Sequence, residues 1–368
     1  MRCEIQFGKF KQAVMLVEKA AGHHTTLPVL SCILLEIKKG NLLLKSTNLD
    51  IGIEVEIPAK SDEEATFAVP ARTLSSFLTQ IEDKEQIVKL ESVSGNLNIS
   101  LPKSKGTLKT VPHDDFPAIP TAQDGKTTPF PSDILIKGFR SVWYSAAVSN
   151  VKPELSSIFI YKDDSTAVFV ATDSFRLAEK KIQLPKSISF TDMLVPFKNS
   201  VEMIRVLEAM GPSVSMRSSK NLISLEANGI RVTSRIIDGV FPDYRQIIPK
   251  GYSTEAIVLK HDLMNTLKIS TVFSDTFNQI HFRLDPKKKQ FELETKNSDI
   301  GENKTELDAA ITGEPIDMNF NYKYIADCFQ SMEADSLSLQ FNGRNKPLVV
   351  RPISGDQTFL YLVMPMNR

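Results

Sequence analysis

The sequence predicts an α+β fold built from three copies of one module, each with antiparallel sheets outside and two helices inside. A repeat of 125 residues is the first observation behind this prediction: Leu30-Ser31 recurs as Leu155-Ser156, Thr47 as Thr172 and Phe116-Pro117 as Phe241-Pro242. The second is a helical stripe that recurs in every copy. The third is the length of 368 residues, which is too long for one core. The predicted domains are residues 1–125, 126–250 and 251–368.

A helix is predicted to open each copy, because apolar residues recur there at helical spacing. The stripes in the first two copies are Phe7, Phe10, Val14, Val17 and Ala21, then Leu135, Phe139, Val142 and Ala146. In the third copy the pattern is weaker, with Leu263, Met264 and Leu267, and it predicts a shorter helix.

A second helix follows in each copy. In the first, Pro70 precedes the stripe Leu74, Phe77, Leu78 and Ile81. The same stripe returns 251 residues later as Ile325, Cys328, Phe329 and Met332, where Asn321 is a suitable N-cap. In the middle copy it is Ser200, Met203, Ile204 and Leu207.

Short β-type runs separate the helices, and turn residues separate the runs. The clearest turns are Lys39-Gly40-Asn41, Gly95-Asn96, Asn228-Gly229 and Asn342-Gly343. Residues 118–132 and 249–255 are rich in proline and polar residues and are predicted to be linkers.

Composition excludes several classes of function. No apolar run is long enough to span a membrane, and residues 1–20 lack the pattern of a signal peptide. Three scattered cysteines fit a reducing cytoplasm rather than disulfides or a metal site. Catalytic, phosphate-cradling and metal-binding motifs are missing, so we expect no enzymatic activity, no cofactor and no metal.

Cations on the predicted helices are the main positive signal. Arg72, Lys198 and Lys323 occupy one equivalent position in the three copies, and Lys137, Arg140 and Arg205 lie on other helix surfaces. Each one alone is explained by a solvated helix surface. If the helices share one side of the molecule, together they would contact phosphates without reading bases. Because 44 basic and 44 acidic residues cancel, such binding would be weak and salt-dependent.

Two further stretches suggest a binding surface. ATDSFRLA, residues 171–178, is a strand end followed by the turn chemistry of Thr172-Asp173-Ser174. LYLVMPMNR, residues 360–368, ends the chain with two methionines around Pro365, which suit a surface that repacks around several partners. A terminal strand that only completes a sheet explains the second stretch equally well.

The chain resembles the bacterial DNA polymerase III beta subunit family, the sliding clamps, over essentially its whole length. The matching stretches are LPVLSCILLEI, STNLD, FAVPAR, DDFP, VATDSFRLA, MLVPFK, IIDGVFPDYRQIIP, FNYKYI and YLVMPMNR. This resemblance implies three similar domains per subunit and a head-to-tail homodimer that closes a six-domain ring around double-stranded DNA. The implied partners are the DNA polymerase III alpha subunit, the clamp loader, and other polymerases and repair proteins that carry clamp-binding peptides.

The resemblance also implies which residues bind these peptides. The implied peptide pocket comprises Leu155, Thr172, Ser174, Phe175, Arg176, Leu177, Pro242, Ile247, Val363, Met364, Pro365 and Met366, with Asn321, Tyr324 and Pro347 at its border. Arg176 and Thr172 are expected to bond polar atoms of the peptide. A charged residue at Leu177, or removal of residues 364–368, is expected to abolish peptide binding without unfolding the protein.

Four positions depart from the family pattern. Phe175 stands where the family often has histidine, and Gln246 where a second arginine often follows Arg245. His24 replaces an arginine that can face the DNA. Gly106 replaces an aromatic residue that can anchor the subunit contact, whose other side would be near Val272 and Phe273.

Two other classes of function remain open on the residues alone. A peptide-binding adaptor built from the same repeats would need no ring and no DNA, and a monomer in solution would favour it. An enzyme with a site between domains would need a nucleophile–base pair or a metal set, and hydrolase or nuclease turnover would reveal it.

Overall fold

The computed structural model describes residues 2–22, 27–82, 86–122 and 127–366. It contains two compact units. Unit 1 is Met1–Ile136 with Lys198–Ile236, and unit 2 is Lys137–Phe197 with Ile237–Arg368. The boundary between the units therefore runs through the predicted middle copy.

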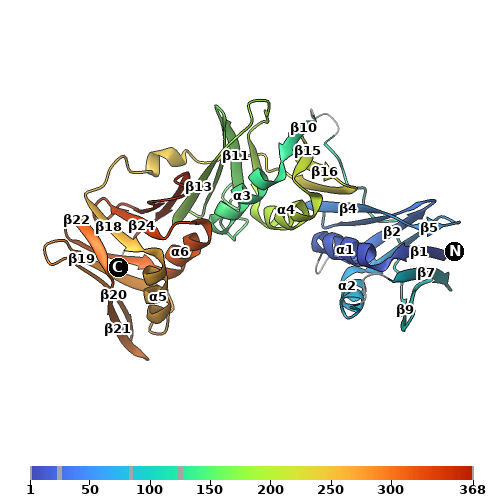
Figure 1. Cartoon of the computed structure of the whole chain (residues 1–368), viewed down its shortest axis with the longest axis horizontal. Helices are drawn as coiled ribbons and strands as arrows, with labels where there is room; N and C mark the ends of the chain where they lie inside the picture. The colour runs from blue at the N-terminus through green and yellow to red at the C-terminus, as the bar shows by residue number, and fades with distance from the viewer. Residues whose placement is uncertain (1, 23–26, 83–85, 123–126, 367–368) are drawn as a thin grey trace. The chain divides into compact units, whose positions relative to one another are not determined.

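All three copies contain the same series of elements: a strand, a helix, four strands, a helix and three strands (Figure 1). In the first copy these are β1 (Arg2–Gln6), α1 (Phe7–Val17), β2 (Cys32–Lys38), β3 (Asn41–Thr47), β4 (Ile51–Pro58), β6 (Ala65–Pro70), α2 (Ala71–Thr79), β7 (Ile87–Val93), β8 (Asn96–Leu101) and β9 (Ser104–Leu108). In the second they are β10 (Thr128–Pro131), α3 (Ser132–Val142), β11 (Ser157–Asp163), β12 (Thr166–Thr172), β13 (Arg176–Gln183), β14 (Met193–Pro196), α4 (Phe197–Met210), β15 (Ser213–Ser218), β16 (Leu222–Ala227) and β17 (Ile230–Arg235).

The third copy repeats this series with β18 (Thr254–Leu259), α5 (Lys260–Thr271), β19 (Gln279–Asp285), β20 (Gln290–Asn297), β21 (Gly301–Glu306), β23 (Ile316–Asn321), α6 (Tyr322–Asp327), β24 (Ser336–Phe341), β25 (Leu348–Pro352) and β26 (Phe359–Val363). The short strands β5 (Lys60–Ser61) and β22 (Ala309–Gly313) are additions to the series. The described single-turn 3-10 helices are η1 (Glu18–Ala20), η2 (Pro28–Ser31), η3 (Trp143–Ser145), η4 (Tyr244–Ile247) and η5 (Cys328–Ser331).

Two of the sheets take strands from two neighbouring copies. The eight-stranded sheet of unit 1 has the order β10-β15-β16-β17-β4-β3-β2-β6, and the nine-stranded sheet of unit 2 has the order β14-β11-β12-β13-β26-β25-β24-β18-β22. In unit 1 the junction is the antiparallel pair β4–β17, with Ile51 opposite Ser234. In unit 2 it is β13–β26, with Arg176 opposite Val363. These shared sheets explain why the compact units do not follow the copies, and the predicted boundaries at 125/126 and 250/251 stay a prediction.

The two remaining sheets each contain strands of one copy. Unit 1 has a five-stranded sheet of order β5-β1-β7-β8-β9, and unit 2 has a four-stranded sheet of order β21-β20-β19-β23. Among the described strands, β9 and β21 end these sheets. By position in the repeat, β9 corresponds to β17 and β26, whereas β21 corresponds to β4 and β13.

Two details of the predicted copies were wrong. Each copy opens with a strand, not a helix, because β1, β10 and β18 are short runs that sequence spacing does not reveal. The first helix of the third copy is not shorter, since α5 has 12 residues against 11 in α1. Its buried face contains Thr266 and Ser270 beside Leu263 and Leu267, so part of the stripe is polar and was not recognised.

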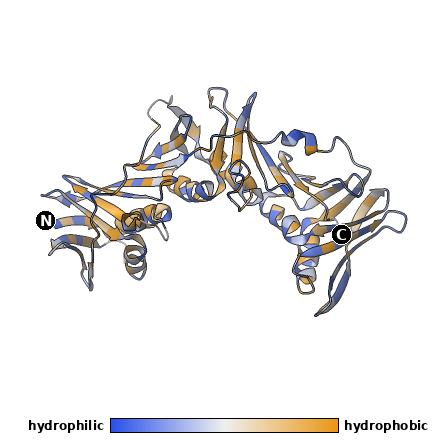
Figure 2. Cartoon of the chain, turned by 180° about the vertical axis from the view of Figure 1, so that it is seen from behind, coloured by the Kyte–Doolittle hydropathy of each residue, from blue (hydrophilic) through white to orange (hydrophobic). Residues whose placement is uncertain are grey.

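The other predicted helices are present, although Ala21, Ile81 and Ala146 of the predicted stripes lie beyond the helix ends. The stripe from Phe7 to Val17 is buried in α1, which packs on β3 and β4. Ile325, Cys328, Phe329 and Met332 are buried at α6 and η5. The side chain of Asn321 caps α6 by accepting a hydrogen bond from the backbone nitrogen of Lys323 at 3.0 Å. Figure 2 shows hydrophobic and hydrophilic residues alternating along the strands, as expected for sheets with one buried face.

None of the described helices combines the length and the apolar character that crossing a bilayer needs.

Candidate functional site

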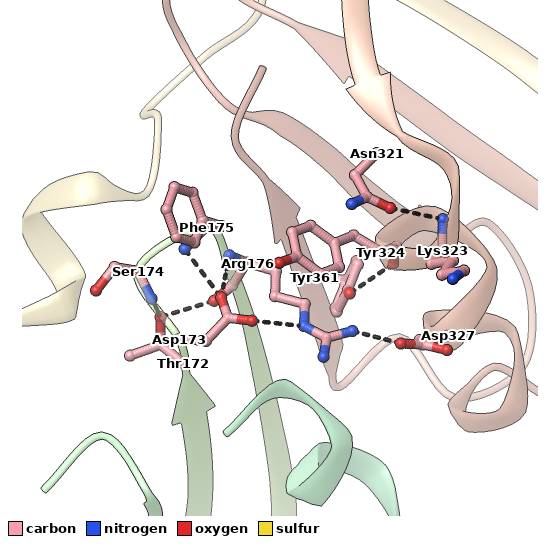
Figure 3. A network of polar contacts seen from close by, with 10 residues as sticks. All are labelled: Thr172, Asp173, Ser174, Phe175, Arg176, Asn321, Lys323, Tyr324, Asp327 and Tyr361. Atoms are coloured by element: carbon pink, nitrogen blue, oxygen red, sulfur yellow. Dashed lines mark hydrogen bonds and ion pairs between the residues drawn. The ribbon is translucent and has the colours of Figure 1, made fainter. Parts of the chain in front are cut away.

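A tight turn between β12 and β13 in unit 2 is built by its own side chains (Figure 3). Thr172 Oγ1 donates to the carbonyl of Arg176 at 2.6 Å and accepts from the nitrogen of Ser174 at 3.1 Å. Asp173 Oδ1 accepts from the nitrogens of Phe175 and Arg176, both at 2.9 Å. Ser174 adopts a φ of 77°, a left-handed conformation that these bonds stabilise. The turn leaves the Phe175 side chain exposed at 61%.

The first copy contains the same turn 125 residues earlier, within unit 1. Thr47 Oγ1 donates to the carbonyl of Ile51 at 2.8 Å, and Asn48 Oδ1 accepts from the nitrogens of Asp50 and Ile51 at 3.0 Å. Leu49 has the same φ of 77° as Ser174. The turn is therefore a property of the module, and its side chains distinguish the copy in unit 2.

Arg176 is the side chain that distinguishes this turn. Its guanidinium lies between Asp173, at 3.0 Å from Nε, and Asp327 of α6, and it stacks over the ring of Tyr324 at 4.5 Å (Figure 3). Burial acts to lower the pKa of Arg176, but Tyr361, Asp327 and Asp173 outweigh it and raise this pKa above its ordinary value. Arg176 and Thr172 were expected to bond a peptide, and in this structure both are engaged within the chain.

The C-terminal residues lie between this turn and β23. The nitrogen of Met364 donates to the carbonyl of Phe175 at 2.8 Å, and the nitrogen of Met366 donates to the carbonyl of Asn319 at 2.8 Å. Met364, Pro365 and Met366 are half-buried, whereas Val363 is buried in β26. Tyr361 donates its hydroxyl to the carbonyl of Tyr324 at 2.6 Å, which ties β26 to α6.

Leu177 belongs to the core beneath the turn. It is fully buried in a hydrophobic cluster with Phe241, Tyr244, Leu360 and Leu362. A charged residue at this position would disrupt that cluster, so we expect such a variant to lose stability as well as peptide binding.

Other predicted pocket residues differ in exposure. Pro242 and Ile247, on either side of Tyr244, are exposed. Leu155 and Pro347 are buried next to β11 and β25, respectively. The described contacts thus join the turn, the C-terminal residues and α6, with Leu177 and its cluster beneath them.

A polar network fixes η4, which carries Ile247. Tyr244 shares a hydrogen bond of 2.7 Å with the hydroxyl of Tyr161 and donates to Glu179. Arg245 donates to the same Tyr161 hydroxyl at 2.8 Å and lies over its ring. Burial, together with Glu179 and Tyr161, raises the pKa of Tyr244. Sequence reasoning missed Glu179, Tyr161 and Asp327, because their partners are far away in the sequence.

Five of the predicted DNA-facing cations fall into two groups. Arg72, Lys198 and Lys323 are exposed, and each is the second residue of its helix, α2, α4 or α6. Lys137 and Arg205 are ion-paired, to Asp356 at 2.6 Å and Glu202 at 3.0 Å.

Arg140 is exposed on α3. His24 lies outside the described residues.

Of the predicted subunit-contact residues, one lies in an edge strand of unit 1 and two follow α5 in unit 2. Gly106 is in β9, and a Cβ there would lie 3.1 Å from the ring of Phe77, which occupies the space an aromatic side chain would need. Val272 is exposed just after α5, and Phe273 is half-buried and approaches Gly301 of β21.

The chain matches three family models in order: the N-terminal domain of the DNA polymerase III beta subunit over residues 1–120, its central domain over 130–243 and its C-terminal domain over 245–367. The chain belongs to the DNA polymerase III beta subunit family.

Curated relatives in this family are named beta sliding clamps. The chain is 25% identical to that of Synechococcus elongatus, covering 100% of this chain and 99% of the relative. It is 27% identical to that of Synechocystis, covering 96% and 95%. The crystal structure of the DNA polymerase III beta subunit of Thermotoga maritima superposes with a TM-score of 0.93 at 26% identity, covering 100% of this chain and 99% of the other. The three-domain clamp fold is therefore shared by these proteins.

Proposed function

We propose that this sliding clamp acts as a ring of two identical chains, joined head to tail, that encircles double-stranded DNA and tethers the replicative polymerase to it. The proposal extends to a non-catalytic role in the bacterial cytoplasm. Its partners would be the DNA polymerase III alpha subunit, the clamp loader, and other polymerases and repair proteins with clamp-binding peptides.

The two incomplete sheets carry the proposal. Both junctions inside the chain join the last strand of one copy to the fourth strand of the preceding copy, as β17 joins β4 and β26 joins β13. The corresponding strands β9 and β21 end their sheets among the described strands. If β9 of one chain pairs with β21 of another, each such contact completes a third composite sheet. Two chains then close with two identical contacts.

The internal junctions also supply a register for this contact. Ser234 in β17 and Val363 in β26, which face Ile51 and Arg176, correspond to Leu108 in β9. Leu108 would therefore face Gly301 of the second chain. Counting along the antiparallel strands from that pair brings Lys103 opposite Glu306.

Charge supports the same pairing. Strand β9 and its flanks carry the exposed lysines Lys103, Lys105 and Lys109, while β21 carries the exposed acids Glu302 and Glu306. Lys304, the one cation of β21, is ion-paired to Glu292 at 2.7 Å. A basic edge would thus meet an acidic one.

Retention on DNA would come from the closed ring rather than from attraction, because the chain carries no net charge. Arg72, Lys198 and Lys323 begin their helices in equivalent places and would contact phosphates without reading bases. The turn at 172–176 and the half-buried residues Met364 to Met366 would hold an apolar anchor of a partner peptide.

Loading by the clamp loader and ATP onto circular and linear duplexes of equal length tests the ring. We expect the clamp to stay on the circle after a wash with high salt and to leave the linear DNA by its ends. Equal retention on both would overturn encirclement. A monomer in sedimentation at micromolar concentration would favour a peptide-binding adaptor instead.

A further inference from the structure

A groove with a volume of about 350 Å³ lies between α5 and α6 in unit 2. Its apolar lining includes Met264 and Leu267 from α5, and Ala326 and Phe329 from α6 and η5. Tyr322 and Gln330 also line it, and they add a phenol and an amide. The groove is therefore an apolar site with a few polar groups, the usual character of a binding site for a flat organic group.

In the first copy, polar bridges join the two helices at the equivalent place. In unit 1, Lys11 of α1 donates to the carbonyls of Thr79 and Ile81 at 3.1 and 2.8 Å. Ser75 of α2 donates to Glu18 at 2.8 Å.

The third copy lacks the groups that make these bridges. Met264 occupies the position of Lys11, Thr271 that of Glu18, and Ala326 that of Ser75. The third copy therefore lacks these two bridges at the place where the groove lies.

Two lysines of α5 line the groove. Lys260 and Lys268 are eight residues apart, so at 1.5 Å per residue they stand about 12 Å apart along the helix. The Lys260 amine donates one hydrogen to the carbonyl of Met332 and has two more to offer. The Lys268 side chain is exposed, and its amine has no hydrogen-bond or ion-pair partner among the described residues. A small ligand with one charge cannot reach both amines, whereas a chain of phosphates with a base between them can.

We propose that the groove between α5 and α6 binds one unpaired nucleotide of single-stranded DNA. The base enters the apolar groove beside Tyr322, and the phosphates on either side contact Lys260 and Lys268. A paired, stacked base has no free face to offer, so duplex DNA does not use this site. The inference rests on the proposed function, in which these helices face DNA.

The test restores the bridge of the first copy in the full-length protein. The double variant Thr271→Glu, Ala326→Ser recreates the pair of Glu18 and Ser75, and both positions are exposed, so the fold should tolerate it. The probe is a thymidine oligonucleotide with one central 2-aminopurine. We expect wild-type protein to quench this base on binding, and the variant to bind the oligonucleotide at least about fivefold more weakly, as expected for the loss of one stacked base.

Two controls separate the groove from charge alone. Asn265→Glu puts the same charge on an exposed position of α5 outside the groove lining and should leave most of the affinity. An oligonucleotide with an abasic central site should bind wild type and double variant equally. The inference is overturned if the double variant binds as tightly as wild type, if Asn265→Glu weakens binding as much, or if wild-type protein leaves 2-aminopurine unquenched.

The double variant should also be loaded on circular duplex DNA. Normal retention there, with unchanged single-strand affinity, would reject the groove while leaving the ring intact. Loss of retention by the wild-type protein would instead reject the proposed function.

Discussion

Arg176 and Asp327 form an ion pair that joins β13 of the second copy to α6 of the third. The arginine side chain is 9% exposed and that of the aspartate is 41% exposed, so the pair reaches from the interior to the surface. Asp173 binds the same guanidinium and also caps the turn at 172–176. The shape of the candidate peptide site therefore depends on both copies.

Removing Asp327 should loosen this site. In Asp327→Ala, Arg176 keeps Asp173 but loses its second carboxylate, so the free energy of unfolding should fall by about 1 kcal/mol, because Asp327 is partly screened by solvent. The affinity for a clamp-binding peptide should fall as well. Urea unfolding and fluorescence anisotropy measure the two effects. Asp192→Ala, at an exposed acid, is the control, and equal behaviour of the two variants would contradict the role given to Asp327.

The repeated turn provides a matched pair of variants. Thr172→Val and Thr47→Val each remove a buried hydroxyl with the same two backbone bonds, so each should lower the free energy of unfolding by about 2 kcal/mol. Only Thr172→Val should weaken binding of the peptide in anisotropy measurements. A similar loss of peptide affinity in Thr47→Val would show that the effect is general destabilisation.

The proposed contact between chains can be tested by exchanging charges. Lys103→Glu places two acids opposite each other at Glu306 and should raise the dissociation constant of the dimer about tenfold, because a closed ring contains the contact twice. Adding Glu306→Lys should restore the dimer. Sedimentation over a range of concentrations measures this, and a double variant as weak as the single one would reject the register.

Acid stability should depend on Asp356. Burial acts to raise the pKa of this carboxyl, but hydrogen bonds from Lys137, Lys180 and Thr358 outweigh it and hold the pKa well below its usual range. Because the folded pKa is lowered, the contribution is complete above the unfolded value of about 3.9 and is lost as pH falls below it. Asp356→Asn should therefore cost about 2 kcal/mol at pH 7, since Lys180 is buried, and less at pH 3. Denaturant unfolding at both pH values measures the difference, and an equal cost at both would refute this assignment.

Much of the fold could be predicted from spacing alone, because helices with one buried apolar face leave a regular pattern. Phe7 to Val17 is such a helix, and the 125-residue repeat places its counterparts. The α5 helix was underestimated because Thr266 and Ser270 take buried positions that are apolar elsewhere. The pairing of β13 with β26 could not be predicted, since nothing local marks which edge strands will meet.

The candidate site was only partly predictable for the same reason. The turn could be predicted from the side chains of Thr172, Asp173 and Ser174, because these residue types form hydrogen bonds with nearby backbone groups. Asp327 and Glu179 carry no local signal, because each matters through a partner that folding brings from elsewhere in the chain. The reason for a glycine at position 106 could not be predicted, because only the structure shows that the ring of Phe77 lies next to it.

The composite sheets mean that no copy is a self-sufficient building block. A fragment that contained only one copy would expose two unpaired edge strands, its fourth and its last. The last strand of one fragment could then pair with the fourth strand of another. Fusing three copies in tandem hides four of the six edges inside one polypeptide. Only the pairing of β9 with β21 is then left for contacts between separate polypeptides, so open-ended polymers could form through that one contact alone.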